Sequence, residues 1–174
     1  MIAVAVSGPV NGQERAVAAA LSAELVHAPS EIPGPPLHGL VVLPAPAPRR
    51  RLVEIDPALW RRTLDANLTR AMELCRAAGP RIASSGGGAI VLVVPPVDER
   101  PAGVHLAAAS GAVAMLARAL AVELGPLGVR VNALVAAPER LERVAPALRL
   151  LLSEEASYVT GEIVPAAGDV LAPS

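Results

Sequence analysis

The stretch GAVAMLARALAVELG, residues 111–125, determines how the rest of the chain must be organised. Between its terminal glycines only Arg118 and Glu123 are charged, and apolar residues occupy every side of the helix that it predicts, which runs from about 106 to 124. A helix that is apolar all round has to be covered all round. The other parts of this 174-residue chain, or a partner, must therefore supply that cover.

The composition predicts a single globular domain, residues 1–174, with few aromatic residues in its core. Apolar residues make up 53% and charged residues 18% of the chain, with no Phe, one Trp and one Tyr, so Ala, Val and Leu must build the core. Acidic and basic residues are interspersed with a net charge of −1, which does not indicate a nucleic-acid groove. All 15 basic residues are arginine, and the chain contains no lysine.

The sequence also carries expectations about location. No uninterrupted apolar run reaches the roughly 18 residues typical of a membrane span. The first residues, MIAVAVSGPV, predict a strand rather than a signal peptide, because no basic residue precedes their apolar ones. The single cysteine allows no disulfide framework. We therefore expect a soluble, cytoplasmic protein without a membrane partner.

Predicted strands and helices alternate along the chain, and the strands are continuous apolar runs. This pattern is typical of an α/β fold in which a parallel sheet is covered by helices on both faces. We find no internal repeat and no domain boundary along the chain. The predicted strands are IAVAV, HGLVVL, AIVLVV, GVRVNALV and GEIVPA, with a stub in LVHAP, and the predicted helices cover about 12–24, 57–78, 106–124 and a proline-interrupted stretch after 138.

Four successive segments carry a family likeness over about 56–165: DANLTRAMELCRAA, GGGAIVLVV, ASGAVAMLARALAVELGPLGVRVNALVAAP and LLSEEASYVTGEIV. In order and spacing they resemble the short-chain dehydrogenase/reductase (SDR) family. The resemblance implies a Rossmann-like sheet and, in most members, NAD(P)-dependent oxidation of an alcohol or reduction of a ketone. It also implies four catalytic positions, usually Asn, Ser, Tyr and Lys, in which the lysine lowers the pKa of the tyrosine.

Only the first of these four positions keeps its residue type. Alignment to the family pattern places Asn67, Pro95, Leu106 and Ser110 at the Asn, Ser, Tyr and Lys positions. Because the chain has no lysine and its only tyrosine is Tyr158, no Tyr-x-x-x-Lys pair exists anywhere in it. We therefore predict that the chain has no catalytic residues.

The segments that hold the cofactor in the family are altered as well. The glycine-rich turn keeps Gly8 and Gly12 but has Glu14 at its third glycine. A carboxylate about 4 Å from a phosphate would cost on the order of 4 kcal/mol at an effective dielectric constant of about 20. The Asn-Asn-Ala-Gly that follows the next strand corresponds to 43–46, Leu-Pro-Ala-Pro, and the Pro-Gly after VNALV to 136–137, Ala-Ala.

Internal segments are short too. The family usually holds two strands and a helix between the first helix and HGLVVL, where about 14 residues remain here. The substrate lid that usually follows VNALVAAP is missing. The resemblance therefore implies a Rossmann-like three-layer sheet that is shortened on its strand 2/strand 3 side and lacks the lid. We expect no cofactor on this chain itself.

In the SDR family the two helices that carry Asn and Tyr pack against the same pair from another subunit. Such a four-helix interface would cover the helix at 106–124. The resemblance thus favours an inactive subunit that docks on an active SDR paralogue, or on a copy of itself, with NAD(P) in the partner and ketoacyl or hydroxyacyl thioesters as substrates. The expected interface residues are Trp60, Leu64, Leu68, Cys75, Val113, Leu116, Leu120 and Leu124.

Two alternatives stay open. In one, the chain is an oxidoreductase with replaced catalytic residues, in which His105 titrates near neutrality with help from Asn67, Asp98 and Glu99. In the other it is an acyl-carrier or small-molecule binding module, in which residues 49–51, Arg-Arg-Arg, contact a phosphate. The same residues also have structural interpretations: His105 as a helix-end residue, the arginines as solvated surface groups.

For the remaining residues we favour structural interpretations, with residual phosphate binding as the alternative for Gly8 and Gly12. Gly8 and Gly12 permit a strand-to-helix turn. Asn67 and Asn132 are hydrogen-bonding residues of the fold, and Cys75 is a small core residue. The resemblance further implies that Tyr158 packs near the end of the last helix.

Overall fold

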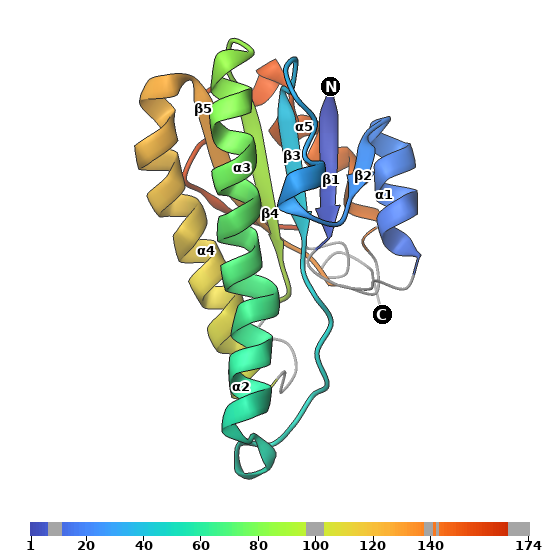
Figure 1. The fold of residues 1–174 in the computed structure, drawn as a ribbon, viewed down its shortest axis with the longest axis vertical. Helices are drawn as coiled ribbons and strands as arrows, with labels where there is room; N and C mark the ends of the chain where they lie inside the picture. Colours follow the sequence, from blue (N-terminus) through green and yellow to red (C-terminus); the bar gives the residue numbers. More distant parts are fainter. Residues whose placement is uncertain (7–11, 97–102, 138–140, 142, 167–174) are drawn as a thin grey trace, which may run out of the picture.

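The described part of the chain forms one parallel sheet with helices on both faces (Figure 1). The computed structural model describes residues 1–6, 12–96, 103–137, 141 and 143–166. Within those residues the sheet has six strands in the order β2-β1-β3-β4-β5-β6. The strands are β1 (Ile2–Val6), β2 (Glu24–Val26), β3 (Gly39–Leu43), β4 (Gly88–Val94), β5 (Val129–Val135) and β6 (Ile163–Pro165), and the helices are α1 (Gln13–Leu21), α2 (Pro57–Leu64), α3 (Arg70–Ser84), α4 (Val104–Leu124) and α5 (Ala145–Leu152).

The three central strands, β3, β4 and β5, are apolar because both faces of the sheet are covered there. All five residues of β3 are buried. In β4 every residue after Gly88 is buried. The continuous apolar runs therefore predicted these strands correctly, and with them the parallel Rossmann-like sheet.

One edge of the sheet is short. Strand β2 has three residues and pairs with β1 through Ala3–Glu24, Leu25–Val4 and Val26–Ala5. The chain then passes through a single 3-10 turn, Pro29–Glu31, and enters β3 on the other side of β1. The strand stub expected in LVHAP is thus present, one residue earlier than its quoted letters. Of the two strands that the family usually has here, this stub alone occurs within 22–38.

Helices α3 and α4 cover one face of the sheet, and α1 and α5 cover the other (Figure 1). On the first face Leu74, Ile82 and Ala117 are completely buried against Ile90 and Leu92. On the second face Val17 and Leu148 meet Val91 and Leu134. The sheet thus separates two cores, and both are almost entirely aliphatic.

The helix predicted over 57–78 extends further and changes form. After α2, residues Asp65–Thr69 form a π-helical turn, and α3 continues to Ser84. The predicted end at 78 was wrong because Ile82 buries its whole side chain in the core, which holds the next turn helical despite Pro80. Trp60, on the part of the helix that projects beyond the sheet, is exposed, whereas Cys75, which packs on the sheet, is buried (Figure 1).

The apolar helix at the centre of the sequence begins two residues earlier than predicted and ends where predicted. By length and composition, the span Val104–Leu127 is apolar enough to cross a membrane, with a mean hydropathy of 1.5. In the structure, one side of α4 packs on β4, β5 and α3. That packing is what a core helix of a soluble α/β domain shows, so the sequence length alone is weak evidence for a membrane span.

Candidate functional site

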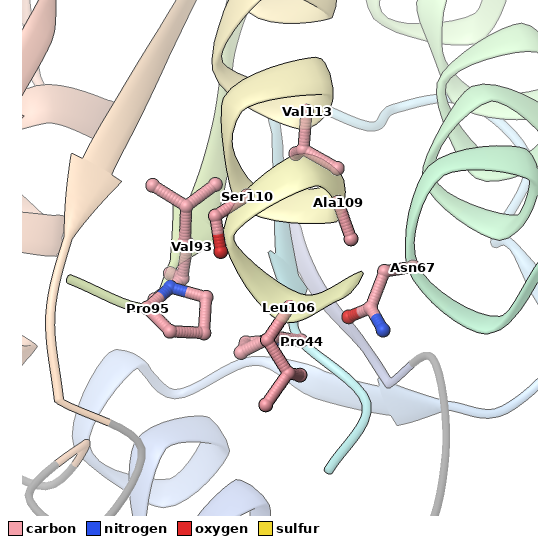
Figure 2. A pocket seen from close by; sticks show the side chains of 9 residues that line it. Pro44, Asn67, Val93, Pro95, Leu106, Ala109, Ser110 and Val113 are labelled. Atoms are coloured by element: carbon pink, nitrogen blue, oxygen red, sulfur yellow. The ribbon is translucent and has the colours of Figure 1, made fainter. Parts of the chain in front are cut away.

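A shallow pocket opens at the carboxyl ends of β3 and β4, beside the first two turns of α4 (Figure 2). Its volume is about 240 Å³, including solvent at its mouth. Ligand pockets in α/β sheets form at this edge, but most of this volume is open solvent, and the enclosed part is far smaller than the pocket of a drug-sized ligand. The lining residues are Pro44, Asn67, Val93, Val94, Pro95, Leu106, Ala109, Ser110 and Val113.

All four residues aligned to the family's catalytic positions line this one pocket. In Figure 2, Leu106 lies between Pro95 and Asn67, and Ser110 lies one turn further along α4. Leu106 and Pro95 have no side-chain group that exchanges a proton. Asn67 and Ser110 are the only polar side chains among the nine lining residues. The fold thus retains the position of a catalytic centre and replaces its acid–base residues with aliphatic and neutral ones.

The amide of Asn67 is engaged in the protein itself. Its Oδ1 accepts a hydrogen bond from the backbone N–H of Ala45 at 2.9 Å, and its Nδ2 donates to the carbonyl oxygen of Thr63 at 3.1 Å. The first bond ties the helix to the chain that leaves β3, and the second lies beside the π turn. Asn67 therefore acts as the structural residue that the sequence predicted.

His105 does not line the pocket. Its ring is completely buried, and Nε2 is 3.0 Å from the carbonyl oxygen of Pro48. If Nε2 carries the proton, it donates to that oxygen and Nδ1 is left as an acceptor. Nδ1 has no hydrogen-bond partner among the described residues. His105 thus connects the start of α4 to the proline-rich segment after β3, and Asp98 and Glu99, named as its helpers, lie outside the described residues.

The residues at the N-terminus of α1 do not fit a dinucleotide. Gly12 has a φ of +81° and precedes the helix, as the turn interpretation requires, whereas Gly8 lies outside the described residues. Glu14 stands in the first turn of α1, and its Oε2 is buried without a partner in the described part of the chain. An unneutralised carboxylate there repels phosphate at the position where a Rossmann fold normally attracts it.

The residues after β3 and beside β2 also offer little to bind the rest of a dinucleotide. Pro44 and Pro46 have no backbone N–H to donate after β3, and Ala45 gives its own N–H to Asn67. Beyond the three residues of β2, the described chain forms no further strand on that side. Among the described residues no three His, Cys, Asp or Glu side chains lie close enough to hold a metal ion.

The predicted interface residues separate into two groups. Cys75, Val113 and Leu124 lie in this chain's own core, so they have almost no surface to offer a partner. Leu64, Leu68, Leu116 and Leu120 are half-buried, and Trp60 is exposed.

The exposed apolar side chains of α4 were not among those predicted. Met115 is 56% and Val122 is 80% exposed, and Val104 begins the same outer side. Met72 is exposed on α3. The sequence signal for this side is Arg118, which lies three residues after Met115 and four before Val122 and is exposed with them.

Two further expectations about single residues have opposite outcomes. Asn132 is buried in β5, donates to the carbonyl oxygen of Val159 at 2.9 Å and accepts from the N–H of Glu162 at 3.1 Å, as a structural residue should. The expected packing of Tyr158 was wrong, because its side chain is fully exposed. It lies in the loop between the 3-10 turn Glu154–Ala156 and β6, where the described chain has nothing to cover it.

Comparison with known proteins gives consistent matches. A family model described as enoyl-(acyl carrier protein) reductase matches residues 34–141, which is more than half of the chain. A protein of Bradyrhizobium diazoefficiens, named as a probable short-chain type dehydrogenase/reductase, is 30% identical in an alignment 152 residues long that covers 71% of this chain and 54% of that protein. The cis-4-hydroxycyclohexanecarboxylate dehydrogenase of Sinomonas cyclohexanicum is 31% identical in an alignment 150 residues long that covers 70% of this chain and 60% of that protein.

Solved structures agree in fold. The TT0495 protein of Thermus thermophilus matches with a TM-score of 0.72 and 28% identity over 97% of this chain and 88% of its own. A short-chain dehydrogenase/reductase from Brucella ovis matches with a TM-score of 0.77 and 22% identity over 94% of this chain and 98% of its own, a likeness that concerns the fold alone. The chain spans about half the length of the curated relatives that it matches.

Proposed function

This chain belongs to the short-chain dehydrogenase/reductase family, and we propose that within it the chain is a catalytically inactive subunit that docks on an active member and supports it. One observation carries the proposal. The pocket formed by the family's four catalytic positions contains Leu106 and Ser110 where a proton-donating tyrosine and its lysine would be.

The loss concerns the whole reaction rather than one step. Hydride transfer to or from a ketone needs a dinucleotide and a group that moves a proton on the substrate oxygen. Glu14 and the prolines after β3 oppose binding of the dinucleotide. Leu106 takes the place of the group that would move the proton. A single replacement could be compensated by a neighbour, but His105 is buried outside the pocket and no lysine exists in the chain.

The outer side of α4 supports the docking half of the proposal. The exposed side of α4 carries Met115 and Val122 on either side of Arg118, and Trp60 on α2 and Met72 on α3 are also exposed. Exposed apolar side chains on neighbouring helices are typical of a surface that binds a partner. A partner's equivalent helices would complete a four-helix interface there. Burial of about 800 Å² on each subunit would suffice for a stable complex.

The partner would hold NAD(P) and perform the chemistry. The family model that matches this chain is described in terms of an acyl carrier protein substrate. We propose, from the commonest roles of the family rather than from that description, that the assembly reduces ketoacyl thioesters or dehydrogenates hydroxyacyl thioesters in the cytoplasm.

The experiment is to purify the chain alone and together with full-length SDR proteins of the same organism, and to measure complex formation and NAD(P)H-dependent reduction of acetoacetyl thioesters. We expect no turnover by the chain alone and a complex that the double variant Met115→Arg/Val122→Arg abolishes. Leu150→Arg is the matched control, because Leu150 is similarly exposed on α5, on the other face of the sheet. Turnover or saturable dinucleotide binding by the isolated chain would overturn the inactive half of the proposal.

A further inference from the structure

The segment between β3 and α2 forms an arm that projects beyond the sheet, at the bottom of Figure 1 and at one end of the molecule's longest axis. Its tip is the 3-10 turn Leu52–Glu54, in which no residue is buried. Leu52 is 69% and Val53 is 86% exposed, and Val53 is the most exposed large aliphatic residue in the described part of the chain. Two adjacent aliphatic side chains thus stand uncovered at the end of a projection.

The arm is supported just before its tip by the start of α4. The carbonyl oxygen of Pro48 lies 3.0 Å from Nε2 of His105, whose ring is completely buried. The carbonyl oxygen of Arg50 approaches Gly103 so closely that an added Cβ there would lie 2.8 Å from it. These two contacts hold the base of the arm, so the aliphatic residues of the tip are presented outward rather than folded onto the core.

The polar groups of the tip are bonded to one another. The backbone N–H of Glu54 donates to the carbonyl oxygen of Arg51 at 2.9 Å, and that of Ile55 donates to Leu52 at 3.2 Å. The side chain of Glu54 accepts the backbone N–H of Arg51 and pairs with its guanidinium group, each at 3.0 Å. The turn is therefore neutral and largely satisfied, which lowers the cost of bringing it into a less polar environment.

The charge that stays unpaired behind the tip is positive. Arg50, Arg61 and Arg62 are exposed, and no ion pair involves any of them within the described residues. Asp56 attracts Arg62 and offsets part of this charge. Because α2 begins at Pro57 and rises by about 1.5 Å per residue, the second and third of these arginines lie only about 6–8 Å from its start. An anionic surface that met the tip would therefore also attract these arginines.

A lipid bilayer fits this tip better than a protein partner does. A stable protein interface needs about 800 Å² on each side, whereas the uncovered apolar part of the tip is two side chains on a narrow projection. Peripheral proteins bind membranes with a few inserted apolar residues and cations at the level of the headgroups. The expectation that the chain has no membrane partner rested on its lack of a long apolar run, which a contact of this kind does not need.

We propose that the tip of the arm binds the surface of an anionic lipid bilayer. Leu52 and Val53 enter the headgroup layer, and the exposed arginines behind them contact lipid phosphates. This contact uses a different surface from the outer side of α4, so it does not depend on the proposed docking.

The test is cosedimentation of the full chain with vesicles of equal parts phosphatidylglycerol and phosphatidylcholine, and with vesicles of phosphatidylcholine alone. We expect the wild type to bind the anionic vesicles at least about tenfold more tightly than the neutral ones. Leu52→Ser/Val53→Ser should weaken binding to the anionic vesicles at least about tenfold. Leu127→Ser/Leu150→Ser is the matched control, because both leucines are 55% exposed and lie outside the arm, and it should bind like the wild type.

A second pair of variants tests the charges. Arg61→Gln/Arg62→Gln should weaken binding to the anionic vesicles about tenfold and make it less sensitive to salt. Arg15→Gln/Arg143→Gln removes the same charge at exposed positions outside the arm and should have a smaller effect. Equal losses in the two arginine variants would mean that the whole chain adsorbs by its charge, which overturns the inference.

The remaining outcomes separate this inference from the docking proposal. If the wild type binds neither kind of vesicle, or if the serine variant binds as well as its control, the inference fails. If Leu52→Ser/Val53→Ser instead abolishes a complex with a full-length SDR protein, without vesicle binding by the wild type, the tip contacts protein and the inference also fails. Docking is judged separately by Met115→Arg/Val122→Arg, which should not weaken vesicle binding.

Discussion

Asn67 holds the backbone of Ala45 through a 2.9 Å hydrogen bond, although the two residues are 22 positions apart in sequence. The bond fixes the helix that follows Asp56 to the chain that leaves β3, at the mouth of the pocket. It also satisfies a backbone N–H that has no strand partner at this point. The asparagine of a former catalytic position thus has a structural reason to persist.

Replacing Asn67 with alanine should lower the free energy of unfolding by about 1–3 kcal/mol, because it leaves the N–H of Ala45 buried without an acceptor. Urea denaturation followed by circular dichroism measures the change. Thr69→Ala is the matched control, since Thr69 lies in the same π turn and is exposed. It should change stability by less than about 0.5 kcal/mol. Equal losses in both variants would show that the bond to Ala45 is unimportant.

The sequence predicted those parts of the fold that depend only on which residues are buried. Continuous apolar runs such as GLVVL at 39–43 and GAIVLVV at 88–94 can only be covered strands, and their alternation with helices predicts a parallel sheet. The short edge at β2 followed from the few residues available between α1 and β3. These features depend on composition and length, which the sequence contains directly.

The details of the site depend on geometry that the sequence does not contain. Nothing in DANLT indicates a π turn, and the apolar spacing alone does not indicate that α2 projects beyond the sheet and leaves Trp60 exposed (Figure 1). In α4 most positions are apolar, and only Arg118 marks the side on which Met115 and Val122 are exposed. The four residues aligned to the family's catalytic positions line one pocket, because the parallel sheet brings the ends of its strands and the start of α4 to one edge.

The turn between α3 and β4 offers a comparison between two adjacent glycines. An added Cβ at Gly87, whose φ is +100°, would lie 2.6 Å from the carbonyl oxygen of Gly128. At Gly86, with a φ of +94°, nothing lies within 4 Å. Gly86→Ala should therefore cost only backbone strain, about 1 kcal/mol. Gly87→Ala adds a collision with backbone and should cost about 2–4 kcal/mol. Thermal and urea unfolding of the pair measures the difference, and equal stabilities would contradict it.

Restoring the catalytic residues alone should not restore activity. Leu106→Tyr/Ser110→Lys returns the family's Tyr-x-x-x-Lys spacing to α4, at positions that line the pocket. Glu14 still opposes a pyrophosphate, so we expect no NADH-dependent reduction of acetoacetyl thioesters by this variant.

Adding Glu14→Gly to the double variant Leu106→Tyr/Ser110→Lys measures how much the charge of Glu14 weakens NADH binding. Removing the carboxylate should tighten NADH binding, measured by fluorescence, at least about tenfold, which corresponds to about 1.4 kcal/mol. Arg15→Gly is the control for loosening the first turn of α1 without removing negative charge. If the Glu14 and Arg15 variants bind NADH equally, charge repulsion does not explain the poor fit.

The buried thiol of Cys75 provides a prediction about pH. Burial raises its pKa from about 9.0 to about 12. Below pH 9 the thiol is protonated in both folded and unfolded chains, so it does not make stability depend on pH. Between about pH 9 and 12 it ionises only in the unfolded chain, which lowers the free energy of unfolding by up to about 1.4 kcal/mol per pH unit.

This dependence can be observed because few other groups interfere. The chain has no lysine, and its single tyrosine is fully exposed. Urea unfolding of the wild type should therefore show a free energy of unfolding that falls from pH 9 to 10.5. The variant Cys75→Ala should be less stable than the wild type at pH 7, and its free energy of unfolding should change less between pH 9 and 10.5. Iodoacetamide should label the native thiol at pH 8 only as fast as the chain unfolds, because the thiolate is the reactive form. Rapid labelling of the folded protein, or parallel pH curves for the two proteins, would show that Cys75 is accessible to solvent and that its pKa is not raised.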